Sequence, residues 1–122
     1  MDEQSKTDKS RPHDFDQAYR ALLIAVWKRN ERTILERARN LRALTKDLRD
    51  GSADVRLAEM AEHDAHRLSG CLGSFGLEEA SRMAQEIERI LRSPRWTDIQ
   101  NRKQMADLSL CLEQNIVQNR LG

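Results

Sequence analysis

The residues best suited to nucleophilic chemistry are two histidines in the middle of the chain, His63 and His66. An imidazole titrates near neutral pH, so one of its ring nitrogens is free to attack an electrophile. Attack through Nε2 requires the proton to sit on Nδ1, and a carboxylate or carbonyl beside Nδ1 would hold it there. The chemistry therefore requires a carboxylate that can reach one of these rings.

Two glycines follow His66 on the same side of a helix, Gly70 at i+4 and Gly73 at i+7. Each glycine costs a helix about 1 kcal/mol relative to alanine. A stripe of bare backbone beside a histidine would let a bulky partner bring its own group up to the imidazole. The alternative is close packing between helices or fraying near a helix end, which is the commoner reason for such glycines.

Glu88 is the candidate carboxylate. Residues 66 and 88 are equally far in sequence from Leu77, which stands beside a turn, so an antiparallel helical hairpin would bring them level. Glu88 also follows the apolar residue Ile87 directly and so flanks the core side of its helix. The alternative interpretation is a solvated surface glutamate, which describes most glutamates.

Amphipathic helices must position these residues. The chain has 122 residues, with 4% aromatic residues and two prolines, a composition typical of one helical domain. Apolar spacing predicts helices from about Asp14 to Gly51, Ala53 to Gly73, Leu77 to Ser93 and Thr97 to Arg120. The predicted core positions are Trp27, Ile34, Leu41, Leu48, Ala58, Ala61, Ala65, Leu68, Leu72, Phe75, Leu77, Ala80, Ala84, Ile87, Leu91, Met105, Leu108, Leu112 and Ile116, with Leu23, Ala38 and Leu44 beside the stripe of the first helix.

These elements predict an all-α fold, an antiparallel up-down four-helix bundle, because the helices are joined by short connections. Residues 1–13 lack periodicity and are rich in Asp, Ser and Lys. They are predicted to be a disordered or loosely docked N-terminal tail. The predicted organisation is thus a flexible tail over 1–13 and a bundle domain over 14–122.

The string AHRLSGCLGSFGL, residues 65–77, resembles the motif of histidine-containing phosphotransfer (HPt) domains. That motif is Ala-His-x-(Leu or Ile)-Lys-Gly followed by a Gly-Ser-x-Gly-Leu turn. The continuation ASRMAQEIE, residues 80–88, is similar to the third bundle helix of the family. The resemblance is clearest over residues 53–92 and extends to 17–120. It implies that His66 carries a phosphoryl group and that Glu88 orients its ring.

The resemblance also implies a function in two-component signalling. His66 would accept a phosphoryl group from a receiver-domain aspartate and pass it to another response-regulator receiver. The resemblance implies a phosphocarrier and not an enzyme, and no glycine-rich nucleotide loop occurs in the sequence that would contradict this. No cofactor is expected on this chain, since the magnesium ion belongs to the partner receiver. Partners could include a hybrid histidine kinase, and the family expectation is a monomer.

Ser69 departs from the family motif, which usually has lysine there. Serine keeps a hydrogen-bond donor but loses the cation that would attract phosphoryl oxygens or the acidic site of a partner. The alternative function is therefore a pseudo-HPt adaptor, which binds receivers without carrying phosphate. The predicted access and docking residues around His66 are Gly70, Ser69, Gly73, Arg67, His63 and Gln85.

A metal site is the first rival interpretation. Glu59–His63 and Glu62–His66 are both i,i+4 pairs of a carboxylate and an imidazole, a spacing that could hold zinc or iron. The other predicted bundle helices contain no histidine that could complete the ligand set. No metal site is therefore predicted.

Nucleic-acid binding is the second rival interpretation. Residues 28–49 contain eight Lys or Arg against three Asp or Glu, so the first helix is basic. A solvated helix face is the usual fate of such a run, and a basic surface could also steer an acidic receiver. The net charge of the whole chain is only +1, which excludes a bulk polyanion binder. No nucleic-acid partner is predicted.

Other features of the sequence indicate the cellular compartment in which the protein is expected. The sequence has no run of about 18 apolar residues, so no membrane span is predicted. The polar start of the chain lacks the apolar stretch of a secretory signal. Two cysteines are too few for a disulfide scaffold, and a reducing cytoplasm is the expected location.

Overall fold

The computed structural model describes the backbone of residues 2–121 and the side chains of residues 14–121. Four helices follow one another along the chain: α1 (Asp2–Asp50), α2 (Val55–Ser74), α3 (Glu78–Arg92) and α4 (Ile99–Gln118). The described residues contain no strand, which confirms the all-α prediction.

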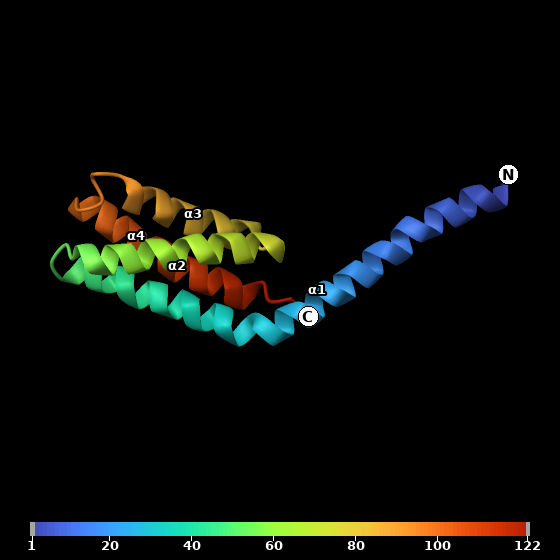
Figure 1. Cartoon of the computed structure of the whole chain (residues 1–122), viewed down its shortest axis with the longest axis horizontal. Coiled ribbons are helices and arrows are strands. Elements are labelled where there is room, and N and C mark those ends of the chain that lie inside the picture. Colours follow the sequence, from blue (N-terminus) through green and yellow to red (C-terminus); the bar gives the residue numbers. More distant parts are fainter. Residues whose placement is uncertain (1, 122) are drawn as a thin grey trace. The chain divides into compact units, whose positions relative to one another are not determined.

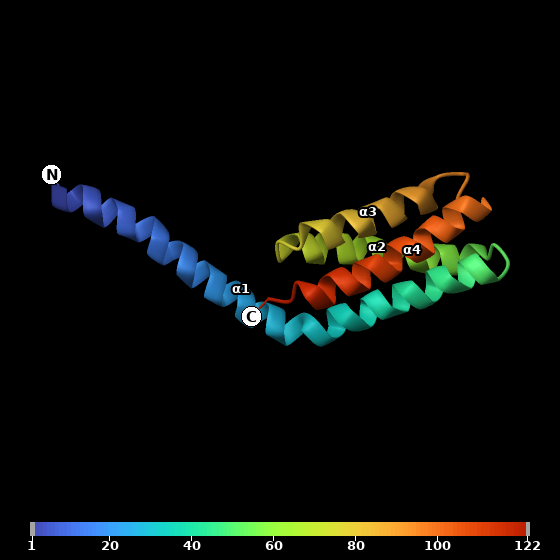
Figure 2. The ribbon, with the colours of Figure 1, turned by 180° about the vertical axis from the view of Figure 1, so that it is seen from behind.

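The chain divides into two compact units, Met1–Glu31 with Leu121–Gly122, and Arg32–Arg120. In the first unit, the described residues up to 31 are a continuous stretch of α1. In the second unit, the rest of α1 and the three following helices lie side by side and alternate in direction, as Figures 1 and 2 show. This arrangement confirms the predicted up-down four-helix bundle.

The start of α1 differs from the sequence prediction. The backbone of residues 2–13 is helical, whereas the absence of apolar periodicity predicted a disordered or loosely docked tail. Helical backbone needs no apolar stripe, so the absence of periodicity does not by itself set the backbone conformation, and the helix continues through Pro12, which cannot donate a backbone hydrogen bond. The side chains of residues 1–13 lie outside the described residues, so the tail at 1–13 and the domain at 14–122 stay predictions.

The connection from α1 to α2 is built by two local contacts. The amide of Gly51 donates to the carbonyl of Asp47 over 2.8 Å and closes the last turn of α1. The carboxylate of Asp54 then accepts from the amides of Arg56 and Leu57 at 2.8 and 3.4 Å and caps α2. Because Asp54 is the cap, α2 begins at Val55 and not at the predicted Ala53.

A Schellman turn joins α2 to α3. Gly76 has φ +75°, in the left-handed region that glycine tolerates best. The amide of Leu77 donates to the carbonyl of Leu72, and that of Gly76 to the carbonyl of Gly73, each over 3.0 Å. This turn reverses the chain, so α2 and α3 run antiparallel around Leu77.

The core follows the predicted seams of α2 and α3, whose apolar positions are buried. In α4 the prediction of Leu108 as a core residue is wrong, because Leu108 is half-buried while Ser109 is fully buried. The hydroxyl of Ser109 lies 2.6 Å from the hydroxyl of Thr45 on α1. Since each hydroxyl has a partner, two polar residues can occupy the bundle interior.

Candidate functional site

The structure brings His66 of α2 and Glu88 of α3 together. Nδ1 of His66 lies 2.7 Å from Oε2 of Glu88. The side chain of His66 is 67% exposed, whereas that of Glu88 is only 12% exposed. The turn at Leu77 therefore places the two residues opposite each other on α2 and α3. The carboxylate is mostly covered and contacts the ring at Nδ1, while the imidazole is exposed to solvent.

This contact determines which ring nitrogen is available. An ionised carboxylate can only accept hydrogen bonds, so the short contact fits a neutral imidazole whose proton is on Nδ1. Nε2 then carries a free lone pair at the exposed side of the ring. The arrangement can perform nucleophilic attack on an electrophile that approaches from solvent.

Arg92 is a member of the site that the sequence analysis missed. Its Nη2 lies 2.8 Å from the same Oε2 of Glu88, and its Nε lies 2.8 Å from Oε1 of Glu62 on α2. The hydrogen bond to Glu62 and the charge of Glu88 raise the pKa of Arg92. The i,i+4 spacing of Glu88 and Arg92 was visible in the sequence, but such pairs are common on exposed helix faces.

Arg92 also borders a hollow beside the histidine. The residues that line it come from α2 and from the end of α3: Glu59, Glu62, His63, His66 and Arg92. Within the described residues, no group of three or more His, Cys, Asp or Glu is placed to hold a metal ion. The pairs Glu59–His63 and Glu62–His66 therefore acquire no third ligand there.

The two glycines after His66 lie in different surroundings. A β-carbon added at Gly70 would meet nothing within 4 Å, so the backbone there faces open space. A β-carbon added at Gly73 would lie 3.4 Å from Oγ of Ser81 on α3. Gly70 thus fits the bare patch beside the histidine, and Gly73 fits the alternative of close packing between helices.

Ser69 directs its hydroxyl to the backbone. Its Oγ donates to the carbonyl of His66 over 2.8 Å, as serine does inside helices. The carbonyl of Ser69 accepts from Oγ of Ser81 at 2.7 Å, and Nε2 of Gln85 donates to that Oγ at 3.4 Å. Ser69 and Gln85 are thereby joined through Ser81, and this hydroxyl–amide chain fixes α2 against α3 next to the site.

Arg67 and His63 lie on the exposed side of α2. Both act on Asp64 of the same helix: burial raises the pKa of Asp64, and the charges of His63, Arg37 and Arg67 oppose that shift. Neither Arg67 nor His63 contacts the His66–Glu88 pair through a hydrogen bond or ion pair among residues 14–121. Their predicted role in access and docking stays a prediction.

Four of the eight basic residues in the run on α1 form ion pairs with acids. Arg39 and Arg42 share Glu113 of α4, at 3.5 and 2.9 Å. Arg32 pairs with Glu36, and Arg49 with Asp50. Of these carboxylates only Glu113 comes from another helix, so the rest of α1 keeps part of the basic face that the sequence presents.

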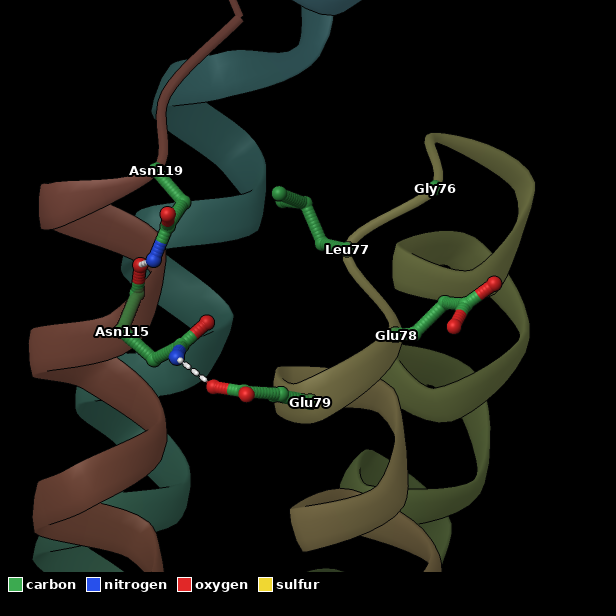
Figure 3. Close-up of a pocket in the computed structure, with 6 residues that line it drawn as sticks. All are labelled: Gly76, Leu77, Glu78, Glu79, Asn115 and Asn119. Carbon is green, nitrogen blue, oxygen red and sulfur yellow. Dashed lines mark hydrogen bonds between the residues drawn. The ribbon is translucent and has the colours of Figure 1, made fainter.

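A second hollow lies at the far end of the α2–α3 hairpin (Figure 3). It is lined by Gly76, Leu77, Glu78, Glu79, Asn115 and Asn119. Figure 3 shows Glu79 directed toward α4, where Nδ2 of Asn115 donates to its Oε2 over 3.1 Å, while Glu78 is directed away. Leu77 is eleven positions from His66, roughly 16 Å along the helices, so this hollow is separate from the histidine site.

None of the helices in the described part of the chain has the length and apolar character that crossing a membrane requires.

Comparison with known proteins places the geometry in a family. Residues 23–118 match the family model described as the Hpt domain. Protein RcaC of Microchaete diplosiphon is 30% identical over 105 residues, which cover 86% of this chain but only 16% of that protein. No solved structure matches significantly. Since the match includes all of α2 and α3 with the paired His66 and Glu88, the chain belongs to the histidine-containing phosphotransfer (Hpt) domain family, whose members are phosphocarrier modules of phosphorelays.

Proposed function

We propose that His66 accepts a phosphoryl group from the aspartyl phosphate of a response-regulator receiver and passes it to the receiver of another response regulator. The observation that carries the proposal is the 2.7 Å contact between Nδ1 of His66 and Glu88 on a ring that is 67% exposed. That contact leaves Nε2 as a free nucleophile on the surface, where the active site of a second protein can reach it.

In the forward step the lone pair of Nε2 attacks phosphorus, and the bond between phosphorus and the aspartate oxygen breaks. The aspartate leaves as a carboxylate, and the proton stays on Nδ1 next to Glu88. The ring gains positive charge as the new bond forms, and the carboxylate of Glu88 stabilises that charge. Transfer to a second aspartate is the same step in reverse, so the site is restored without net loss of a proton.

Access to Nε2 depends on the surface of α2 one turn further along. Gly70 is exposed and has open space where a β-carbon would be. A receiver that carries its own acidic residues and magnesium ion needs room to bring the phosphoryl group within bonding distance. The bare backbone at Gly70 supplies that room, with Arg67, Ser69 and Gln85 around it as docking residues.

The proposed protein needs no cofactor of its own, because the magnesium ion is on the receiver. It acts as a phosphocarrier and not as a kinase. The proposed partners are receivers and a hybrid histidine kinase in the cytoplasm, with this chain as a monomer.

Phosphoryl transfer from receivers tests the proposal. Receivers of the same organism, phosphorylated with radiolabelled phosphate, should label the wild-type chain but not His66→Gln. The label should be acid-labile and stable in alkali, as expected for phosphohistidine. A receiver whose phosphorylated aspartate is replaced by asparagine is the control and should transfer nothing.

The alternative function is a pseudo-HPt adaptor, and the observation that favours it is the hydroxyl of Ser69. This side chain replaces the usual lysine and donates to the carbonyl of His66, so it offers no cation to phosphoryl oxygens. If no receiver labels the wild-type chain, although one binds it and His66→Gln with equal affinity, the relay is wrong and the adaptor is right.

A further inference from the structure

Two rungs connect α2 and α3 at the histidine site. His66 faces Glu88 in the first rung, and Glu62, one turn earlier on α2, faces Arg92, one turn later on α3, in the second. Both pairs are equally far in sequence from Leu77, so the antiparallel hairpin places the partners of each pair level. The guanidinium of Arg92 then joins the two rungs diagonally, through Oε2 of Glu88.

We propose that Arg92, held by Glu62, is the positioning residue that keeps Oε2 of Glu88 on Nδ1 of His66. The proposal deepens the phosphoacceptor function and rests on it. A glutamate side chain with one contact can turn about three bonds, and each alternative rotamer would remove the acceptor from the ring. An ion pair of Arg92 with the same oxygen, at 2.8 Å, restricts that freedom.

The chemistry of a guanidinium suits this role. Arg92 can donate several hydrogen bonds and accepts none, so it holds the carboxylate without competing for the proton on Nδ1. Its fork can also engage two carboxylates at once, here through a hydrogen bond to Oε1 of Glu62 over 2.8 Å and an ion pair with Oε2 of Glu88 at 2.8 Å. The side chain of Arg92 is 59% exposed, so without Glu62 it would be free to move away into solvent.

The tautomer of His66 is the direct readout. In the wild type, ¹⁵N NMR of the neutral ring should show the proton mainly on Nδ1. In Arg92→Gln the proton should be shared more evenly between the two nitrogens, because Glu88 is no longer held. Arg92→Lys should lie between them, since an ammonium group can pair with Glu88 but lacks the planar fork that also serves Glu62. A residue that only stabilised the bundle would leave the tautomer unchanged.

Labelling by phosphoramidate is the second readout. This small donor transfers its phosphoryl group to Nε2 and releases ammonia, so it needs no receiver. Arg92→Gln should be labelled more slowly, by roughly tenfold or less, as for other partners that orient a functional side chain. Arg89→Gln is the matched control: Arg89 lies on the same helix and pairs with Glu86, away from His66, so its rate should equal that of the wild type.

A double-mutant cycle tests the part of Glu62. If Glu62 acts through Arg92, Glu62→Gln should slow phosphoramidate labelling in the wild type and have no further effect in Arg92→Gln. Additive losses would show that Glu62 acts by another route and would overturn the proposal that Glu62 holds Arg92 on Glu88. An unchanged tautomer in Arg92→Gln would overturn it as well. Failure of the proposed relay looks different, because receivers would then transfer nothing while the tautomer and the phosphoramidate rates still followed Arg92.

Discussion

His66 is exposed, and Glu88 beneath it is almost covered, although the two touch. This difference suits the proposed carrier function, in which the nucleophilic nitrogen would enter the active site of another protein while the opposite nitrogen kept a fixed partner. Glu88 is covered where α3 packs against α2, and the hydrogen bond from His66 ties the ring to it. The orientation of the histidine is therefore a property of two helices and not of one residue.

Replacement of Glu88 by alanine should slow phosphoryl transfer to His66 by roughly tenfold, because the ring loses its orienting acceptor and the stabilisation of its developing charge. Radiolabel transfer from a phosphorylated receiver measures the rate, and circular dichroism should show unchanged helicity. Glu86→Ala is the control, since Glu86 pairs with Arg89 on the outer side of α3. Equal rates for the wild type and Glu88→Ala would remove Glu88 from the mechanism.

At the scale of elements, α2 has a regular seam of buried apolar residues and also two glycines, which lower its helix propensity. Ala58, Ala61, Ala65, Leu68 and Leu72 are buried against the neighbouring helices. Small residues on α2 and α3 let the backbones approach closely, as the hydrogen bond from Ser81 to the carbonyl of Ser69 shows. Gly73 belongs to this close contact, whereas Gly70 has space around it.

The two glycines should therefore respond differently to alanine. Gly70→Ala should raise the free energy of unfolding by about 1 kcal/mol, because its methyl group would enter open space and the helix would gain propensity. Gly73→Ala should gain less, because its methyl group would lie against Oγ of Ser81 at 3.4 Å, and not in open space, and that hydroxyl is engaged with α2. Urea denaturation followed by circular dichroism measures both. An equal gain at the two positions would contradict the distinction drawn between them.

At the scale of the whole molecule, the near-zero net charge arises from many opposite charges that pair across helices. Glu113 of α4 forms ion pairs with both Arg39 and Arg42 of α1, and Arg92 of α3 pairs with Glu62 of α2. Exposed pairs of this kind contribute little stability individually, so most of the stability of the fold comes from the apolar side chains buried along the seams. Ionisable groups that are partly buried without a close partner instead make the stability depend on pH.

Asp64 gives the clearest pH dependence. Burial raises its pKa above the ordinary value of 3.8, so the folded state holds the proton more tightly than the unfolded chain. The free energy of unfolding then falls as the pH rises through the raised pKa. Asp64→Asn removes this loss: the variant should be more stable than the wild type at pH 7, and the difference should shrink as the pH approaches 3.8.

Asp50 supplies a control of opposite sign. The hydrogen bond from Arg49 lowers the pKa of Asp50, so its contribution to stability is present at neutral pH and is lost as the pH falls through the lowered pKa. Asp50→Asn should thus be less stable than the wild type at pH 7. Urea denaturation over a series of pH values measures both variants, and a gain for Asp64→Asn that did not depend on pH would refute the linkage.

The sequence by itself determined that four helices form the bundle, though not where α1 begins, and it determined the seams of α2 and α3 and the candidates His66 and Glu88. These follow from local rules, because apolar spacing shows which side of a helix is buried and the turn at Leu77 sets which residues lie level. The interior of α4 did not follow, since Ser109 is buried only because Thr45 lies opposite it on another helix.

Only the tertiary structure decided how the site is held. Whether Arg92 lies free in solvent or bridges Glu62 and Glu88 depends on the distance between two helices, which no spacing along one helix contains. The same holds for the glycines, since Gly70 and Gly73 lie on one stripe of α2 and differ only in whether Ser81 stands opposite them. Local sequence fixes the face on which a side chain lies, and packing between elements fixes its partner.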